Sequence, residues 1–489
     1  MRTKTLPAVL LALPLVLPLP ARADDDAAAT QPVVPPDETN VDPKSVSGGG
    51  KLFPADSPER ILEVTDRVFP AVVRLDVAQE IYREGKRTLQ RGTGSGVIFD
   101  DEGRILTNYH VAGRAQEIWV TLANKERVRG KLIGDDHWTD LAIVQLDMDE
   151  VRRKEIEFVY AELADGETLV PGQDVIAIGT PFGLSRTMSK GIVSNIERTF
   201  YPEEQDIDGY ETGLFSNWIQ MDAPIAPGNS GGPLVDLNAR VVGINTRGMR
   251  GSDLNFAIPI STVHRVKDAI LQSATDEEKG RVTRADLGID LKPLQDLESF
   301  YNIDPNFGVL IDNVERGSPA AEAGLRVQDI LLEMNGEPTN VRFPEELSAV
   351  RRRIAHLPIG EAVSMKVLRG SEELTVEATP VKLESAIGEE RELKEWGLSI
   401  REVTRPYANS QLLPDDKGVL VTTVRPGYAA AKAELSPGDV IKQVNGQPAE
   451  DLEAFMKLYN QSVEEKTGQI LLTVARRQGT RNALLKVTY

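Results

Sequence analysis

Residues 227–234 of the chain read Pro-Gly-Asn-Ser-Gly-Gly-Pro-Leu. Gly, Asn, Ser and Pro favour tight turns, so the composition alone indicates an ordinary surface loop. The octet also fits the G-x-S-x-G turn that presents the nucleophilic serine of α/β-hydrolases. That turn requires a helix directly after the serine, whereas the residues after Ser230, Gly-Gly-Pro-Leu-Val-Asp, are typical of a turn running into a strand. The stretch therefore favours a β fold around Ser230.

A serine nucleophile needs a base to take its proton and a carboxylate to orient that base. His110 follows the strand-like run ILTNYHV, and Asp140 precedes the apolar run LAIVQL. Each residue alone is compatible with a structural role in a strand-end turn. The order His110, Asp140, Ser230 is that of chymotrypsin, whereas an α/β-hydrolase has its serine first. The only other histidines are His137, His264 and His356, and the last two lie on a predicted helix and in a predicted separate domain.

Composition limits the classes of partner and chemistry. The chain has 489 residues, which suggests about three domains at ~150 residues each. Its net charge of −19 argues against a nucleic-acid partner, which needs clustered Lys and Arg. The absence of cysteine excludes disulfides, thiolate nucleophiles and Cys-ligated zinc. His137 has no potential metal ligands around it in a suitable pattern, so neither a metal nor a cofactor is expected.

The N-terminus predicts export. Arg2 and Lys4 precede the fifteen-residue apolar stretch 6–20, and Ala21-Arg22-Ala23 fits a signal-peptidase site. The stretch is shorter than the ~20 residues that span a membrane, which argues against an anchor. We therefore expect a signal peptide at residues 1–23. The Pro-, Asp- and Gly-rich residues 24–55 predict a disordered linker.

The remaining sequence divides into a β-rich half and a repeated half. Up to residue 262, short runs of Val, Ile and Leu alternate with Gly, Asp and Asn, which predicts a β sandwich or barrel, closed by a helix over 260–275. The segment beginning at Gly308 then recurs at Gly418, an offset of 110 residues. Each copy predicts an α+β domain of ~100 residues with a strand, a short helix, a strand pair turning at Asn-Gly and a second helix.

These motifs together resemble one family. GSGVIFDDEGRILTNYHV, DHWTDLAIVQL, GQDVIAIGTPFGL, GIVSNI, DAPIAPGNSGGPLVD and NFAIPI, in this order, are similar to the HtrA (DegP-type) serine proteases. The resemblance implies a mainly β fold, with a trypsin-like double β-barrel over 56–275 and two PDZ domains over 284–384 and 394–489. It also implies that Ser230 is the nucleophile, His110 the general base and Asp140 its orienter.

With Ser230 as the expected nucleophile, the residues around it suggest an oxyanion hole and a substrate pocket. The glycines around Ser230 allow the N–H groups of Gly228 and Ser230 to point to one spot. No acid occupies the expected pocket walls, so we expect small to medium aliphatic residues before the cut, with Asp222 facing away. The residues expected to line the pocket are Ile225, Ala226, Asn245 and Thr246.

The two PDZ copies should bind peptide C-termini by strand addition, with the carboxylate held by backbone N–H groups. The expected carboxylate loops are 286–289 and 395–398, with Leu287, Gly288, Ile289, Trp396, Gly397 and Leu398 as the contacting residues. Glu434 stands where the first copy has Gly324, which puts ligand binding by the second copy in question.

The resemblance implies an exported, ATP-independent endoprotease of the periplasm or cell envelope that degrades misfolded proteins. The expected partners are unfolded or misfolded substrates, hydrophobic C-terminal peptides at the PDZ domains, and further copies of the chain in a trimer. The acidic, aromatic insertion at 199–217 lies where relatives sense PDZ ligands. The alternative is a chaperone-like peptide-binding assembly whose protease site is mostly latent.

Overall fold

A computed structural model describes residues 57–489, apart from a few short segments, and these residues belong to one compact unit. The expected signal peptide and linker lie outside the described residues. No helix in the described part is long and apolar enough to cross a membrane. The short segments that are not described are 167–168, 181–185, 200–204, 208–209, 250–252, 276–277, 296 and 477–478.

Helix α1 (Pro58–Val68) opens the folded part, as the helical spacing of its apolar residues predicts. Ser57 caps it, because its hydroxyl accepts a hydrogen bond from the Arg60 N–H at 3.2 Å. Pro58 occupies the first turn, where the missing N–H has no helical partner in any case. Val64 and Val68 are 1% exposed and belong to the hydrophobic core that residues of both barrels share.

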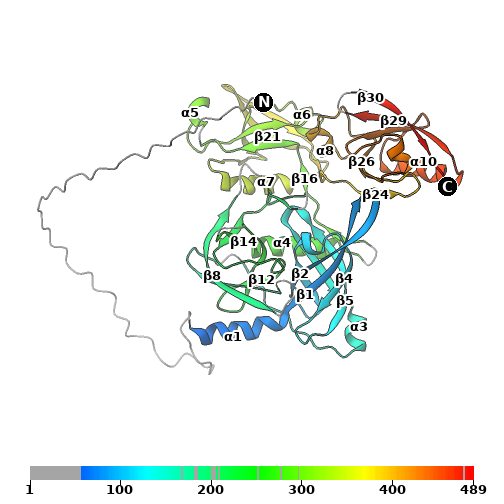
Figure 1. Ribbon diagram of the computed structural model, residues 1–489. Coiled ribbons are helices and arrows are strands. Elements are labelled where there is room, and N and C mark those ends of the chain that lie inside the picture. The colour runs from blue at the N-terminus through cyan, green and yellow to red at the C-terminus, as the bar shows by residue number, and fades with distance from the viewer. Residues whose placement is uncertain are drawn as a thin grey trace, which may run out of the picture. The chain divides into compact units, whose positions relative to one another are not determined.

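The first barrel closes on itself because β5 pairs with both β4 and β6. Its longest pairing is the antiparallel ladder between β1 and β2, which runs from Val72 opposite Val97 to Arg83 opposite Lys86. Figure 1 shows this long hairpin in blue. The six strands are β1 (Val72–Arg83), β2 (Lys86–Ile98), β3 (Arg104–Thr107), β4 (Ala115–Thr121), β5 (Arg127–Asp136) and β6 (Leu141–Leu146), and β15 (Gly280–Arg281) adds to β5.

The second barrel has the order β11-β14-β13-β12-β7-β8 and closes through β8 and β11. Helix α4 (Ile260–Ser273) follows its last strand, which confirms the helix expected over 260–275. The mainly β prediction is therefore confirmed by two closed barrels. The strands are β7 (Asp174–Gly179), β8 (Thr187–Arg198), β11 (Trp218–Met221), β12 (Pro233–Val235), β13 (Val241–Gly248) and β14 (Asn255–Pro259).

Between β8 and β11 the insertion forms a separate small hairpin of β9 (Gln205–Ile207) and β10 (Tyr210–Thr212). Three short helical segments connect strands of the first barrel or extend from it. They are α2 (Tyr109–Ala112), η2 (His137–Thr139) and α3 (Met148–Arg153). Two of these segments, α2 and η2, carry or adjoin the residues expected to be catalytic.

The sequence repeat corresponds to two α+β domains. The first has a sheet of β17 (Ile289–Lys292), β18 (Val309–Val314), β19 (Ile330–Met334), β21 (Val363–Arg369) and β22 (Glu372–Ala378), and β20 (Glu337–Pro338) pairs with β19. A separate two-stranded sheet consists of β16 (Ala285–Asp286) and β23 (Val381–Lys382). The helices of this copy are α5 (Glu298–Tyr301), α6 (Pro319–Glu322) and α7 (Leu347–Ala355).

The second copy has the sheet β24 (Glu390–Leu393), β25 (Leu398–Glu402), β26 (Val419–Val424), β27 (Val440–Val444), β29 (Gln469–Arg476) and β30 (Gly479–Lys486), with β28 (Gln447–Pro448) on β27 and helices α8 (Arg405–Ser410), α9 (Ala429–Lys432) and α10 (Leu452–Glu464). The expected strand pairs do turn at Asn-Gly: Asn335 and Asn445 have φ of 51°, and the glycine after each has φ of 79°. Two successive positive φ values are what a tight hairpin turn requires.

Glu434 adopts the backbone conformation of its glycine counterpart. Its φ is 60°, and Gly324 in the first copy has φ of 81°. Both residues follow the short helix of their copy, where a left-handed residue commonly ends the helix. The substitution therefore leaves the fold of the second copy unchanged at this point.

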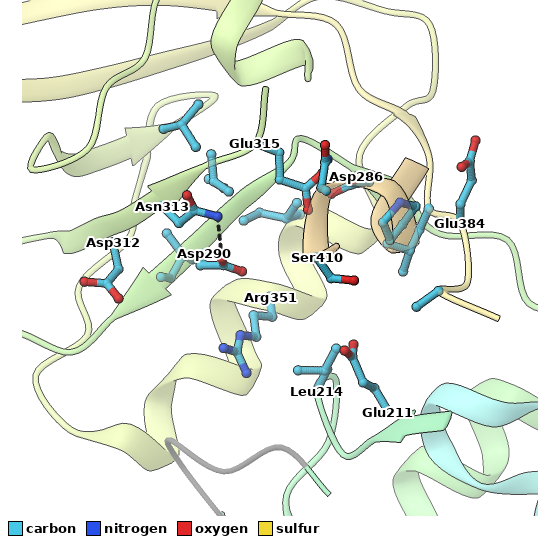
Figure 2. A pocket seen from close by; sticks show the side chains of 18 of the residues that line it. Glu211, Leu214, Asp286, Asp290, Asp312, Asn313, Glu315, Arg351, Glu384 and Ser410 are labelled. Atoms are coloured by element: carbon cyan, nitrogen blue, oxygen red, sulfur yellow. Dashed lines mark hydrogen bonds between the residues drawn. The ribbon is translucent and has the colours of Figure 1, made fainter. Parts of the chain in front are cut away.

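A cavity of about 930 Å³ opens beside β17 and α7 of the first copy. Figure 2 shows Asp290 and Asn313 on one wall, Arg351 of α7 on another, and Leu214 of the insertion facing them. Ile289, Leu291 and Ile354 supply further lining. The space thus combines an unpaired strand edge with a helix, the arrangement that strand addition uses.

Candidate active site

His110 lies on α2, the single helical turn that follows β3. Two groups hold the backbone of this turn. The Tyr109 N–H donates to the Asp140 carbonyl at 3.1 Å, and the Gln79 side-chain amide donates to the carbonyls of His110 and Val111, both at 2.8 Å. The imidazole itself is 21% exposed, so a substrate can reach it.

Asp140 is completely buried and ends the short helix η2. Its φ of 57° is a left-handed value that Asp tolerates better than most residues. The carboxylate accepts from the His110 ring Nδ1 at 2.9 and 3.0 Å, from the His110 backbone N–H at 3.1 Å, and from the Thr246 hydroxyl at 2.7 Å. A buried carboxylate needs such donors, because burial removes its water.

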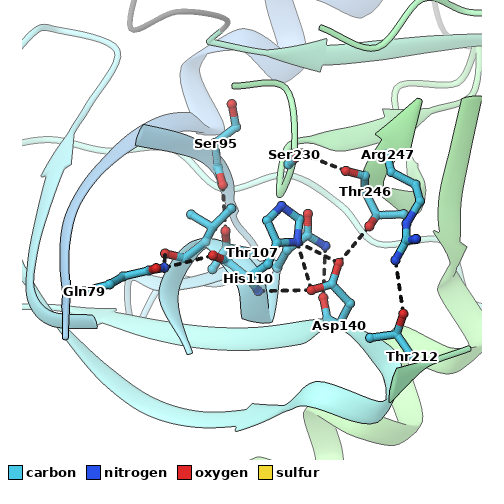
Figure 3. Close-up of polar contacts among 11 residues, drawn as sticks. Gln79, Ser95, Thr107, His110, Asp140, Thr212, Ser230, Thr246 and Arg247 are labelled. Atoms are coloured by element: carbon cyan, nitrogen blue, oxygen red, sulfur yellow. Dashed lines mark hydrogen bonds and ion pairs between the residues drawn. The ribbon is translucent and has the colours of Figure 1, made fainter. Parts of the chain in front are cut away.

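These contacts fix the proton arrangement of the imidazole. An ionised carboxylate can only accept hydrogen bonds, so His110 Nδ1 carries a hydrogen toward Asp140. The other ring nitrogen, Nε2, then carries the lone pair that can accept a proton. The geometry supplies an oriented base, and Figure 3 shows its ring between Asp140 and Ser230.

Ser230 follows β11 and precedes β12 in residues 227–232, here called the serine loop. Its hydroxyl donates to the Thr246 carbonyl at 2.7 Å (Figure 3). Thr246 therefore contacts two expected catalytic residues, Ser230 through its carbonyl and Asp140 through its hydroxyl. The structure brings together all three residues that the sequence order singled out.

The serine loop also leaves two backbone donors unused. Among the described residues, the N–H groups of Gly228 and Ser230 donate to no protein acceptor, whereas those of Asn229, Gly231 and Gly232 donate to Ala226, Asn245 and Asn229 carbonyls. Unpaired N–H groups beside a serine are what an oxyanion hole requires. The expected oxyanion role of Gly228 and Ser230 is compatible with this hydrogen-bond pattern.

Glycine is required after the serine because the loop packs against backbone. A Cβ at Gly231 would lie 2.2 Å from the Ser95 carbonyl oxygen, and one at Gly232 would lie 2.1 Å from the Ile178 carbonyl oxygen. Neither backbone atom can move without disturbing a barrel strand. The glycines therefore serve close packing, in addition to the turn that their composition indicates.

The residues expected to line the substrate pocket differ in exposure. Ile225 and Ala226 are partly exposed, but Asn245 and Thr246 are 0% and 2% exposed. The Asn245 amide donates to the Pro233 carbonyl at 2.9 Å, inside the barrel. The side chains of Asn245 and Thr246 thus line no open space, a correction that leaves only their backbone as a possible wall.

Asp222 was expected to face away from this pocket. Its side chain lies beside β8, where Oδ1 accepts a hydrogen bond from the Ile192 N–H at 2.6 Å. Gly191 makes this approach possible, because a Cβ there would lie 2.3 Å from the same Oδ1. The Asp222 carboxylate thus accepts a hydrogen bond from a backbone N–H of the second barrel.

In the first copy the loop expected to bind a carboxylate bends at Gly288, whose φ is 69°. Its N–H donates to the Asp286 carboxylate at 2.8 Å, and Leu287 is fully buried as an anchor. Ile289 begins β17 and lines the cavity of Figure 2. Among the described strands, β17 pairs only with β18, so its other edge is open to a peptide.

The second PDZ domain differs at the same edge. Strand β24 pairs with β25, with Leu393 opposite Leu398, and covers the edge that a peptide would use. The Gly397 N–H donates to the Leu393 carbonyl at 2.8 Å, and Trp396 and Leu398 are fully buried. Strand addition here would have to displace β24, which corrects the expectation that Trp396, Gly397 and Leu398 contact a peptide.

An aromatic cluster packs around the chain neighbours of His110 and Asp140. Tyr210 of the insertion packs edge-on against Tyr109 and His137, with ring centroids 5.1 and 5.2 Å apart. Trp138 contacts His137 at 4.5 Å and Phe215 at 5.8 Å. The insertion thus contacts residues next to both His110 and Asp140 in the chain.

A buried ion pair ties the same region to the start of the first PDZ domain. Both terminal nitrogens of Arg284 contact the Asp136 carboxylate at 2.6 Å, and the two side chains are 8% and 3% exposed. Burial raises the pKa of Asp136, but the charge and hydrogen bonds of Arg284 outweigh it and hold that pKa below its usual value. The Arg284 guanidinium also stacks 4.9 Å from the Phe215 ring.

His137 and Asp135 have shifted pKa values in this region. Burial lowers the pKa of His137 to about 4, although the neighbouring Asp136 opposes the shift. Burial raises the pKa of Asp135 to about 6, against the attraction of Lys279 and Arg281. Among the described residues, no group of three or more His, Cys, Asp or Glu side chains could hold a metal ion.

Sequence reasoning missed three supporting residues. Gln79, Ser95 and the hydroxyl of Thr246 hold the histidine turn, the serine loop and Asp140. Thr246 and Asp140 lie 106 positions apart, and Ser95 lies 133 positions from Gly228. No local pattern signals such contacts; only the register of the folded strands creates them.

Known proteins resemble the chain over most of its length. Residues 94–244 match the trypsin-like peptidase domain family, and residues 285–379 and 386–475 match PDZ domains. A probable periplasmic serine endoprotease, DegP-like, of Chlamydia trachomatis is 32% identical over 414 residues, which cover 83% of this chain and 77% of that protein. One of the same name from Halomonas elongata is 32% identical over 400 residues, covering 80% and 78%.

Solved structures of HtrA-type proteases are also similar to this chain. The HtrA-type protease AlgW with a decapeptide has a TM-score of 0.54 and 26% sequence identity, covering 66% of this chain and 98% of that one. The same protease with a tripeptide has a TM-score of 0.54 and 28% identity, covering 66% and 97%.

Replacing His137 should change how stability depends on pH. A folded-state pKa of about 4 means that His137 gains its proton more readily when unfolded, so acid favours unfolding between about pH 6.5 and 4. On acidification from pH 7.5 to 4.5, wild type should lose about 1–3 kcal/mol more unfolding free energy than His137→Phe, which keeps an aromatic ring. Asp135 acts in the opposite direction but is present in both proteins. Urea unfolding at the two pH values measures the difference, and equal losses would refute the prediction.

Proposed function

Because this chain belongs to the DegP-like, HtrA-type serine endoproteases, we propose that it degrades unfolded or misfolded proteins in the periplasm, with Ser230 as the nucleophile. It is a serine endopeptidase with a trypsin-like peptidase domain and two PDZ domains. The observation that carries the residue assignment is the hydrogen bond between the buried Asp140 carboxylate and His110 Nδ1, together with Thr246, which bonds both Asp140 and Ser230. The periplasmic location follows that of the named relatives and fits the predicted signal peptide.

In the proposed reaction, Ser230 Oγ attacks the carbonyl carbon of the scissile bond while His110 Nε2 takes its proton. Asp140 holds the ring and stabilises the imidazolium that forms. His110 then returns the proton to the leaving amine, which departs and leaves an acyl-enzyme. A water molecule, deprotonated by His110, attacks the ester carbonyl. The bond from the acyl carbon to Ser230 Oγ then breaks, the carboxylic acid product leaves, and His110 returns the proton to Ser230 Oγ.

Two backbone donors would stabilise the tetrahedral intermediates. The N–H groups of Gly228 and Ser230 have no protein acceptor among the described residues, so the developing oxyanion can use both. Removing one such donor costs an enzyme about 3–4 kcal/mol of transition-state stabilisation. The serine hydroxyl must first leave the Thr246 carbonyl and turn toward His110.

That hydrogen bond is the observation that favours a second candidate function. Because its hydroxyl donates to the Thr246 carbonyl, the Ser230 hydrogen points away from the base that must take it. A peptide-binding, chaperone-like assembly with a mostly latent protease site would populate this arrangement. The two functions are compatible, because a ligand that binds the active arrangement more tightly shifts the population toward it.

We assign peptide docking to the first PDZ domain. Its β17 edge is open and faces α7 across the cavity, whereas β24 covers the corresponding edge of the second domain. The cavity is lined by apolar Ile289, Leu291 and Ile354, which suits a hydrophobic C-terminal side chain. Leu214 and Phe215 of the insertion line the same cavity, so a bound peptide could bias the aromatic cluster behind His110 and Asp140.

We also propose that the chain forms a homo-oligomer, a trimer as in the family it resembles. Apolar side chains are exposed on both α1 and β8, since Leu62, Met188 and Ile192 are 58%, 42% and 40% exposed, and Thr65 of α1 contacts Met188 of β8. A monomeric soluble protein rarely leaves such groups together without function. Sedimentation showing only monomer at micromolar concentration would contradict the proposal.

Ser230→Ala should abolish proteolysis of casein while the protein stays folded. Removing a member of such a triad typically lowers the rate about 10⁴- to 10⁶-fold, because the proton-transfer unit acts as a whole. A fluorescent casein assay measures the loss, and thermal unfolding checks the fold. Retention of a tenth or more of the wild-type rate by contaminant-free protein would contradict the assignment of Ser230 as the nucleophile.

Cleavage should follow small to medium aliphatic residues. The residues expected to line the pocket include no acid, and the Asp222 carboxylate lies beside β8, where it accepts a hydrogen bond from the Ile192 N–H. Mass-spectrometric mapping of cut sites in a denatured proteome measures the preference. A profile dominated by cuts after Lys or Arg would overturn the pocket assignment.

Gly288→Val should weaken binding of peptides with hydrophobic C-termini at least tenfold. A Cβ there would lie 2.3 Å from the Ser318 Cβ, and φ is positive, so the carboxylate loop must distort. Gly397→Val is the matched control, since its Cβ would lie 2.2 Å from the Tyr428 Cβ in the second domain. Fluorescence anisotropy with a labelled peptide measures both. Equal weakening by the two variants, or none by Gly288→Val, would show that the first domain is not the receptor.

A further inference from the structure

Ser95 occupies a strand of the first barrel that passes directly behind the serine loop. It lies on β2, is fully buried, and is flanked by two glycines. A Cβ at Gly94 would lie 2.5 Å from a Val111 methyl group, and one at Gly96 would lie 2.5 Å from an Ile105 methyl group. The strand therefore packs closely against its surroundings, and Ser95 is held in place by the backbone.

The polar atoms of Ser95 contact the serine loop at two points. Its hydroxyl is 2.6 Å from the Gly228 carbonyl oxygen, and its backbone N–H donates to the Ser230 carbonyl at 2.9 Å. These are the two residues whose N–H groups we assign to the oxyanion hole. Ser95 thus holds the loop on both sides of Asn229.

The direction of the hydroxyl bond follows from its partners. The Gly228 carbonyl can only accept, so Ser95 Oγ must donate its one hydrogen there. The Thr180 N–H donates to the same Oγ at 2.8 Å, and the Thr180 hydroxyl lies 3.1 Å away. The hydroxyl thus donates to the Gly228 carbonyl and accepts from the Thr180 N–H, and these two bonds fix its orientation.

We propose that Ser95 is a positioning residue that keeps the serine loop in its oxyanion-binding conformation. This inference rests on the proposed function, because it assigns a role within the same reaction. Gly228 has φ of 104°, in a region that only glycine enters readily, and its neighbouring peptide groups can rotate at low cost. The hydroxyl bond holds the peptide group between Gly228 and Asn229, and the Ser95 N–H holds the one between Ser230 and Gly231. The peptide group that carries the Ser230 N–H is therefore fixed on both sides, so this N–H stays directed at the site of the oxyanion.

The test uses Ser95→Ala in the full chain, with kinetics on a fluorogenic peptide. If the hydroxyl positions an oxyanion donor, kcat and kcat/KM should fall together by about 10- to 100-fold while KM changes less than threefold. This is below the ~10²- to 10³-fold loss on deleting a donor itself. A peptide boronic acid, which forms a tetrahedral adduct with the serine, should lose affinity by a similar factor, whereas the same peptide as an amide should not.

Two further variants separate positioning from stability. Thr107→Val removes another fully buried hydroxyl, which donates to the Ser95 carbonyl at 2.7 Å and has no bond to the serine loop. We expect kcat within threefold of wild type for it. Ser95→Cys fills nearly the same space with a weak donor and should reproduce the kcat loss even if Ser95→Ala unfolds.

The outcomes distinguish this inference from the proposed function. Inactive wild-type protein that also fails to bind the boronic acid would contradict the proposed function. Active wild type with unchanged kcat in Ser95→Cys, or with boronic-acid and amide affinities falling equally, would overturn the role of Ser95 alone. A kcat loss in Thr107→Val as large as in Ser95→Cys would also overturn it, since that would reflect general damage to the cluster.

Discussion

The buried carboxylate of Asp140 is the interaction on which the rest of the site depends. It accepts hydrogen bonds from His110 in the first barrel and from Thr246 in the second, so a single charge joins the two halves. Burying a carboxylate without donors is costly, and this one has a ring N–H, a backbone N–H and a hydroxyl. The same bonds that compensate its burial orient His110. Catalytic geometry and the packing of the two barrels therefore cannot be changed independently here.

The serine loop is organised by a different principle, close approach of backbone to backbone. Gly231 and Gly232 permit contact with Ser95 and Ile178, and the loop carbonyls then take donors from the first barrel. What remains adjustable is the Ser230 hydroxyl, which now lies on the Thr246 carbonyl. In such a site the backbone donors are already in place, and only the Ser230 side chain must rotate toward His110 before the reaction. Such an arrangement suits an enzyme whose activity is regulated by ligands.

Much of this could be predicted from the sequence, and the limits have a physical cause. Turn chemistry and short apolar runs indicated the strands, and the order of His110, Asp140 and Ser230 indicated the reaction. The turns at Asn335 and Asn445 followed from the Asn-Gly pairs. By contrast, the closed edge of the second PDZ domain depends on β24 folding back on β25, and the pairing of Arg284 with Asp136 joins residues 148 positions apart. Neither leaves a local pattern, because each depends on register and burial that only the whole fold determines.

The central claim is that Ser230 is activated through His110 and Asp140, and its chemical reactivity tests that most directly. A fluorophosphonate probe reacts with activated serines, and peptide mapping by mass spectrometry identifies the labelled residue. The account predicts one label per chain, on Ser230, and a labelling rate at least 100-fold lower in Asp140→Asn, where the imidazole loses its orienting charge. A label on another residue, or an unchanged rate in Asp140→Asn, would contradict the account.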